Sequence, residues 1–122
     1  MPEFILKYKV PESVFTDREE EEFALLVHQM AEAVQALIGS RFFGWSVSYD
    51  TRELEMSDGM PDFKITVWVL DNEDRLQSLV EQVQPEIIKT MQGFATEYQT
   101  VGCSFQRVKG KWGQARGLKE DL

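Results

Sequence analysis

Three residues of this chain are of a type that could do chemistry: Pro2, His28 and Cys103. Pro2 follows the first methionine, so removal of Met1 would leave a secondary amine at the chain terminus. An apolar wall or a nearby cation would lower the pKa of that amine and leave a neutral base near neutral pH. Such a base moves a proton between atoms next to a carbonyl. The alternative is that Pro2 only begins a strand, where its missing N–H does no harm.

His28 and Cys103 fit structural roles better than catalytic ones. His28 lies beside the apolar stripe of an expected helix, and Cys103 falls inside an expected strand with no histidine placed to activate it. One cysteine and one histidine are too few ligands for a zinc site within one chain. We therefore expect no metal and no cofactor.

Four strands are expected from apolar residues that alternate along the chain. They cover residues 3–10, 42–49, 62–70 and 100–108. The second strand is expected to bend or bulge near residues 50–52 and to continue to residue 56. In the third strand, Phe63 and Ile65 should face the core, while Lys64 and Trp68 face away from it.

Two helices are expected from the helical period of the remaining apolar residues. The first runs from about residue 17 to residue 38, with Thr16 and Glu19 at the spacing of a capping box and Gly39 as the residue after its end. The second runs to about residue 98, and Pro85 inside it must kink it or split it. No internal repeat of the short solenoid kind is visible.

The expected fold class is α/β, as an α+β sandwich with the element order β-α-β-β-α-β. A four-stranded sheet carries two helices on one face, and the second helix is kinked at Pro85. The 122 residues suit one domain, which we place at residues 1–108, followed by a C-terminal tail at residues 109–122. Folds of this kind serve enzymes and binding modules alike, so the fold alone does not give the function.

Composition narrows the possible partners. The net charge is −8, from 21 acidic and 13 basic residues, and such a chain repels phosphate backbones. We therefore expect no nucleic-acid partner. No segment is apolar enough to span a bilayer, so no membrane partner is expected. A single cysteine fits a reducing compartment, and we expect a cytoplasmic protein.

Short segments of the chain resemble the carboxymethyl-hydroxymuconate isomerases, a branch of the tautomerase superfamily. The start, Met1-Pro2-Glu3-Phe4-Ile5, is similar to the family's Met-Pro-His-Phe-Ile. Met56-Ser57-Asp58-Gly59 followed by Asp62-Phe63 is similar to the family's Met-Ala-Asp-Gly followed by Asp-Tyr. Further matches fall at Ile88-Lys89-Thr90 and at Ser104-Phe105.

The resemblance implies a trimer of β-α-β-β-α-β subunits with Pro2 as the general base at a pocket between subunits. It also implies arginines that hold a small carboxylate substrate and polarise its carbonyl, because the guanidinium binds carboxylate oxygens in pairs. Arg41, Arg52 and Arg75 are the candidates nearest to the family's positions. The implied activity is that of a tautomerase that moves a proton in a small keto-enol acid.

The alternative function is a non-enzymatic, ferredoxin-like binding or regulatory module that acts through protein–protein contacts. Trp68 is a large aromatic on the expected open face of the sheet, and aromatic residues favour the cores of interfaces. Trp112, among glycines and lysines in the tail, has the character of an anchor for a partner or a neighbouring subunit. The alternative is a disordered tail in which Trp112 binds nothing. Both candidate functions predict a homo-oligomer or a protein partner.

Overall fold

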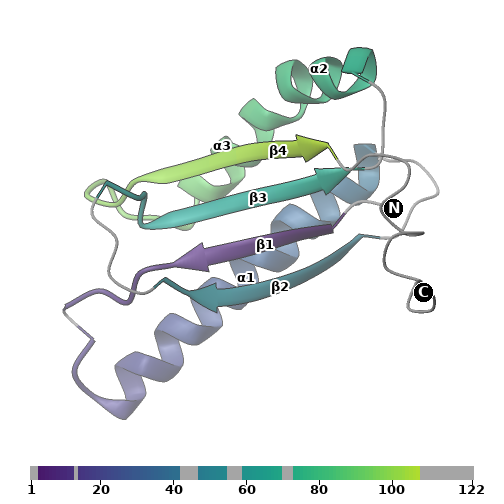
Figure 1. Cartoon of the computed structure of the whole chain (residues 1–122). Helices are drawn as coiled ribbons and strands as arrows, with labels where there is room; N and C mark the ends of the chain where they lie inside the picture. Colours follow the sequence, from purple (N-terminus) through teal and green to yellow (C-terminus); the bar gives the residue numbers. More distant parts are fainter. Residues whose placement is uncertain (1–2, 13, 42–46, 55–58, 70–72, 108–122) are drawn as a thin grey trace, which may run out of the picture.

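The computed structural model describes residues 3–12, 14–41, 47–54, 59–69 and 73–107 (Figure 1). Its elements in chain order are β1 (Glu3–Tyr8), α1 (Asp17–Arg41), β2 (Ser48–Glu53), β3 (Phe63–Val69), α2 (Glu73–Gln82), α3 (Gln84–Gln92) and β4 (Val101–Arg107). The predicted β-α-β-β-α-β order is confirmed, with the second helix divided into α2 and α3. None of the described helices has the length and apolar character needed to cross a membrane.

The four strands form one mixed sheet in the order β2-β1-β3-β4. β1 pairs in parallel with β2, β3 pairs in parallel with β4, and β1 and β3 are antiparallel at the centre. Each βαβ unit therefore places its two strands side by side. A ferredoxin-like sheet is a split βαβ arrangement, in which the two strands of a unit are not neighbours. The expectation of a ferredoxin-like module is wrong in this respect.

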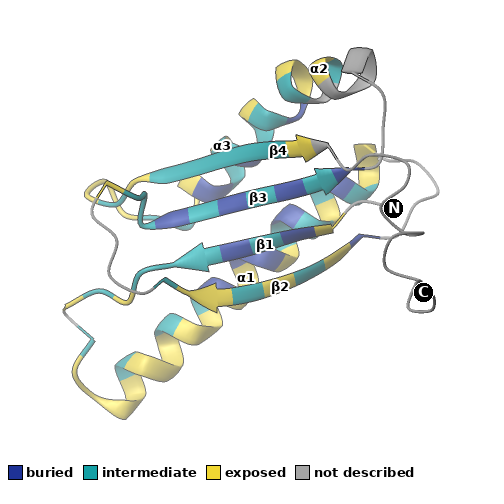
Figure 2. Cartoon of the chain, in the orientation of Figure 1, coloured by how far each residue is buried: buried dark blue, intermediate teal, exposed yellow. Residues whose placement is uncertain are grey.

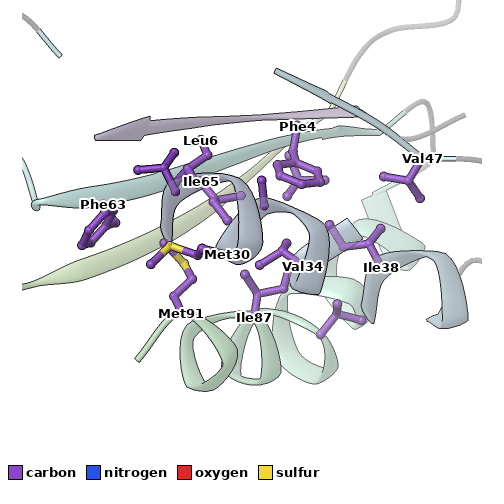
Figure 3. Packing of buried hydrophobic residues seen from close by; sticks show 14 of the residues in the cluster. Phe4, Leu6, Met30, Val34, Ile38, Val47, Phe63, Ile65, Ile87 and Met91 are labelled. Carbon is purple, nitrogen blue, oxygen red and sulfur yellow. The ribbon is translucent and has the colours of Figure 1, made fainter. Parts of the chain in front are cut away.

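All described helices lie on one face of the sheet, and the core fills the space between them and the strands (Figures 1 and 3). Alternate residues of β1 and β3 point into this core, among them Phe4 and Leu6 in β1 and Phe63 and Ile65 in β3. The largest fully buried side chains are Phe4, Phe63, Leu6, Met30, Ile38, Ile65, Ile87, Met91, Val34, Val67 and Val69. The intervening residues form a second face that no described element covers (Figure 2).

The second strand differs from its prediction. β2 covers Ser48–Glu53 and pairs residue for residue with Glu3–Tyr8, so the expected bend near residues 50–52 is absent. The strand lies at the edge of the sheet, and four of its six residues are exposed. Apolar alternation is weak on such a strand because only one of its faces packs on the core. Residues 42–46, where most of the predicted strand lay, are outside the described residues.

The helices follow the sequence signals at their starts more closely than at their ends. Thr16 and Glu19 form the predicted capping box before α1: the Thr16 hydroxyl accepts from the Glu19 N–H at 3.1 Å, and a Glu19 carboxylate oxygen accepts from the Thr16 N–H at 3.2 Å. α1 then continues through Gly39 to Arg41, so Gly39 does not end it. α2 and α3 are separated at Val83, with Pro85 in the first turn of α3, and α3 ends at Gln92 instead of near residue 98.

Candidate functional site

One end of the sheet brings together segments that are far apart in the sequence (Figure 1). β1 and β2 begin there, and β3 and β4 end there because they run in the opposite direction. α1 ends a few residues before β2, and α2 begins a few residues after β3. We call this the β1-start end. Glu3, the first residue of β1, lies at this end.

The helix-facing side of the β1-start end is apolar. Val47 and Val69 each lie one position beyond the residues that pair with Glu3, and they are 9% and 1% exposed. Both belong to the same buried cluster as Ile38 of α1. Pro2 itself lies outside the described residues. The strands on either side of the start of β1 therefore present hydrocarbon to the helix layer at this end.

Two of the three predicted arginines lie on helix ends near the β1-start end. Arg41 is the last residue of α1, and its guanidinium forms an ion pair with the Glu86 carboxylate of α3. Both side chains are partly exposed, so the guanidinium is held in place but remains accessible to solvent. Arg75 is the third residue of α2, within one turn of the helix start that follows β3. The ion pair fixes the position of Arg41 and also means that a substrate carboxylate must share the cation with Glu86.

Arg52 does not lie with the other two. It pairs in register with Lys7 near the far end of β1, and four residues of extended chain, about 13 Å, separate it from the start of β2. Its Nε lies 3.2 Å from an oxygen of Asp50. The side chain belongs to the open face of the sheet because Tyr49, three positions earlier, packs against the core. Arg52 and Arg41 therefore cannot hold the same small substrate within one subunit.

The two predicted interface residues differ in what the structure describes. Trp68 lies on the open face, between Glu3 of β1 and Gln106 of β4, and it is half-buried. Its position agrees with the predicted alternation of β3. Trp112 is outside the described residues, as is the rest of the predicted tail.

A polar group that sequence reasoning missed joins β2 to α1. The Tyr49 hydroxyl lies 3.2 Å from His28 Nδ1, and His28 Nε2 lies 3.4 Å from a Glu32 oxygen. Burial, and to a smaller extent the Glu32 carboxylate, raise the pKa of Tyr49. The spacing of His28 and Glu32 on one helix face was visible in the sequence, but the partner in β2 depends on the fold. His28 and Glu32 are exposed and Tyr49 is half-buried against the core, so the contact joins the outer strand to the helix layer.

Cys103 is a half-buried residue of β4, and its thiol is not nucleophilic at neutral pH. Burial raises the pKa of the thiol to about 12. A reactive cysteine needs the thiolate form, which a cationic or polar neighbourhood favours. Within the described part of the chain, no three histidine, cysteine, aspartate or glutamate side chains are close enough together to hold a metal ion.

The fold and this end of the sheet define an α+β protein made of two βαβ units. No protein-family model matches the sequence, and no curated protein matches it. A solved structure described as "Crystal Structure of Native Ps01740" is similar in fold, with a TM-score of 0.55 and 13% sequence identity. The match covers 90% of this chain and 96% of that one, so the likeness in fold extends over most of the chain.

Proposed function

We propose that this protein is a tautomerase-like isomerase that moves a proton in a small keto-enol acid, with the Pro2 amine as the base. The amine takes a proton from the carbon next to the carbonyl of the substrate, and the electron pair left behind forms an enolate with its charge on oxygen. The ammonium then returns the proton to another atom of the same conjugated system. The reaction is an isomerisation and needs no cofactor.

The apolar wall at the β1-start end is the observation that carries this proposal. An amine next to Val47 and Val69 would be poorly solvated in its charged form, so its pKa would lie below the ordinary value. A base with a pKa near the working pH is the most effective one. The sequence places the amine at the start of β1, and this is the end of the sheet where desolvation would act on it.

Arg41 supplies the second element of the proposal. Its guanidinium is a permanent cation at the same end of the sheet, and it is held by Glu86. A guanidinium binds a carboxylate through two parallel hydrogen bonds and stabilises negative charge that develops on a nearby oxygen. Arg75, at the start of α2, would be a second clamp. We assign no role in this site to Arg52, which lies on the open face.

The resemblance to the carboxymethyl-hydroxymuconate isomerases implies a trimer with its pocket between subunits. The confirmed element order supports the resemblance. The number of copies in solution is measurable by light scattering, and three is the number expected for this function.

The first experiment is an intact-mass measurement on the purified protein, because the mechanism requires that Met1 is removed. If Met1 is absent, tautomerisation of hydroxyphenylpyruvate should be measured in the native protein and in Pro2→Ala. Loss of the base should lower the rate by about 10² to 10⁴-fold.

The matched control is Pro61→Ala, which removes a proline from the start of β3 and leaves the chain terminus untouched. Its rate should stay within about twofold of the native rate, given that proline-to-alanine changes act mainly on the unfolded chain. Retained Met1, or a Pro2→Ala rate equal to that of the native protein, would refute the proposed mechanism.

The half-buried Trp68 favours a second candidate function, that of a non-enzymatic module that binds through the open face of the sheet. In this case Trp68→Ala should weaken assembly or partner binding by at least about tenfold. Tyr98→Ala is the matched control, because Tyr98 is an aromatic residue that is 87% exposed and lies outside the sheet. Equal behaviour of the two variants in a sedimentation or light-scattering experiment would count against this candidate.

A further inference from the structure

The open face of the sheet carries three basic side chains side by side. Lys7 of β1 pairs in register with Arg52 of β2 on one side and with Lys64 of β3 on the other. All three alternate with core residues, so they point away from the helices. Neighbouring strands are about 4.8 Å apart, so the three backbone positions span roughly 10 Å. We call Arg52, Lys7 and Lys64 the basic row.

This arrangement works against the stability of the sheet. Like charges directly opposite one another on paired strands repel and destabilise the pair. The chain has a net charge of −8, yet no acidic residue stands between these three cations in the row. Local features that conflict with the stability of the fold are typical of functional positions.

The two lysines of the basic row are not neutralised by a described neighbour. Among the described residues, no carboxylate oxygen lies within 4 Å of the Lys7 or Lys64 ammonium group. The nearby Asp50 is hydrogen-bonded to the Arg52 Nε and to the Thr51 N–H. No hydrogen bond from a described residue occupies the two terminal nitrogens of Arg52, the pair that grips an anion.

The fourth position of the same row is closed by an apolar ring. Lys64 pairs with Gly102 of β4, and a Cβ at Gly102 would lie 3.3 Å from Cγ of Pro61. The row is thus bordered on the β4 side by the Pro61 ring, which brings no charge to compete with the two lysines for an anion. Lys9, two residues after Lys7 and just beyond the end of β1, adds positive charge nearby. Its Nζ donates to the Met60 carbonyl oxygen at 2.5 Å.

We propose that the basic row is a binding site for a compact polyanion, a small molecule with two or more carboxylate or phosphate groups. Three cations about 5 Å apart match two anionic groups on one small molecule. A nucleic acid would need a longer stripe, and Glu3 and Asp50 on the same face would repel it. The site lies at the opposite end of the sheet from Val47 and Arg41, so it does not depend on the proposed isomerase activity.

The test is a titration of the full chain with citrate and with pyrophosphate, each compared with sodium chloride at equal ionic strength. Amide chemical shifts in NMR spectra report where each anion binds in the unmodified protein. The largest changes should fall at Lys7, Arg52 and Lys64. Binding of citrate alone indicates a polycarboxylate ligand, and binding of pyrophosphate alone indicates a polyphosphate. No binding of either above the chloride control, or changes centred on Arg41, would overturn the proposal.

The variant arm compares Lys7→Gln/Lys64→Gln with Lys89→Gln, a control that removes an exposed lysine from α3 on the helix side. The double variant should bind the anion at least about tenfold more weakly, which is the loss expected for one strong charge-assisted contact or more. The control should stay within about twofold.

Urea unfolding is a second measurement, and it distinguishes a lost binding site from a general loss of stability. Without anion, the double variant should unfold at an equal or higher urea concentration than the native protein, because the cross-strand repulsion is gone. With anion, only the native protein and the control should gain stability. A double variant that is less stable and still gains from the anion would refute the site. Pro2→Ala should bind the anion like the native protein, so a failure of the isomerase proposal remains distinguishable.

Discussion

The two βαβ units of the molecule share one plan and differ in how they end. The registers allow an approximate two-fold axis perpendicular to the sheet, and matching the Phe4 and Phe63 segments places it between the paired residues Leu6 and Ile65. Rotation about this axis exchanges Phe4 with Phe63. It also exchanges the outer strands, because β2 is parallel to β1 and β4 is parallel to β3. The chain therefore consists of two similar βαβ halves, whose strands β1 and β3 pair antiparallel at the centre of the sheet.

The sequence repeats at the head of the two halves. Met1-Pro2-Glu3-Phe4 leads into β1, and Met60-Pro61-Asp62-Phe63 leads into β3. In the second half the head is a structural clamp: one Asp62 carboxylate oxygen accepts from the Thr100 N–H at 2.8 Å and from the Thr100 hydroxyl at 3.2 Å. Pro61 has an amide nitrogen inside the chain and cannot act as a base. A Cβ at Gly102 of β4 would lie 3.3 Å from Cγ of Pro61, so the Pro61 ring packs against β4 and has a structural use.

The helical layers of the two halves also differ. The first half has one helix of 25 residues, while the second has α2 and α3 with a break at Val83. The outer strand of the first half, β2, is mostly exposed, whereas the described side chains of β4 are mostly half-buried. Both outer strands have a polar contact with the helix layer: the Gln84 side chain donates to the Cys103 carbonyl oxygen of β4 at 2.6 Å, and the Tyr49 hydroxyl of β2 lies 3.2 Å from His28 Nδ1. By the exposure of its side chains, the second half therefore covers its outer strand better than the first.

The largest expected effect is on the residues at the two-fold axis. Leu6 and Ile65 are both fully buried, so replacement of either by alanine leaves a cavity. Each of Leu6→Ala and Ile65→Ala should lower the free energy of unfolding by about 3 kcal/mol. Urea unfolding followed by fluorescence measures both losses. Since the two positions are equivalent in the plan, the losses should agree within about 1 kcal/mol.

A matched control for these two variants is Leu25→Ala, which removes the same atoms from an exposed position of α1. Its effect should stay within about 0.5 kcal/mol. If Leu6→Ala and Ile65→Ala lowered the free energy of unfolding by very different amounts, the two halves would be alike in topology and not in the packing of their cores.

The next largest expected effect is a loss of stability at alkaline pH that arises in the second half only. The two-fold axis relates Cys103 of β4 to Thr51 of β2, and of these two side chains only the cysteine can lose a proton. Burial raises the pKa of the thiol from 9.0 to about 12, so the unfolded chain loses this proton first as the pH rises. The stability that depends on the neutral thiol is complete below about pH 9 and is lost between pH 9 and pH 12. The loss is at most about 1.4 kcal/mol per pH unit.

The measurement for the thiol is urea unfolding at pH 8 and pH 10 for the native protein and for Cys103→Ala. The tyrosines titrate in both proteins, so the difference between the two pH dependences isolates the thiol. The native protein should lose more stability than the variant over this interval. Identical pH dependence of the two proteins would mean that the thiol is not desolvated in the native state.

The order of the elements was predictable from the sequence because the central strands and α1 have strong local patterns. Phe63 and Ile65 alternate with polar residues in a strand that is buried on one face, and Thr16 with Glu19 announces the start of a helix. β2 was misplaced because an edge strand needs few apolar residues. The partners of a strand were not predictable either, and the ferredoxin-like expectation failed for that reason.

For the candidate sites too, the sequence indicated single residues but not which residues the fold brings together. Pro2 could be proposed from its place in the chain, whereas Arg41 and Arg75 were proposed because they lie nearest to the arginines that the family resemblance implies. The basic row could not be predicted, because Lys7, Arg52 and Lys64 lie far apart in sequence and meet only through the register of three strands. The contact between Tyr49 and His28 likewise depends on where β2 lies beside α1.

The smallest expected effect is at the start of the helices, where the halves differ in capping. α1 begins with the Thr16 and Glu19 capping box, while α3 begins after Val83 without a side-chain cap. Thr16→Ala should lower the free energy of unfolding by about 1 kcal/mol, because an N–H of the first turn loses its partner. Glu19→Gln keeps the reciprocal hydrogen bond and should cost less. Urea unfolding of the two variants gives both values. A Thr16→Ala protein as stable as the native one would mean that the first turn of α1 frays before the molecule unfolds, and that packing in the core, with no help from the cap, holds this helix.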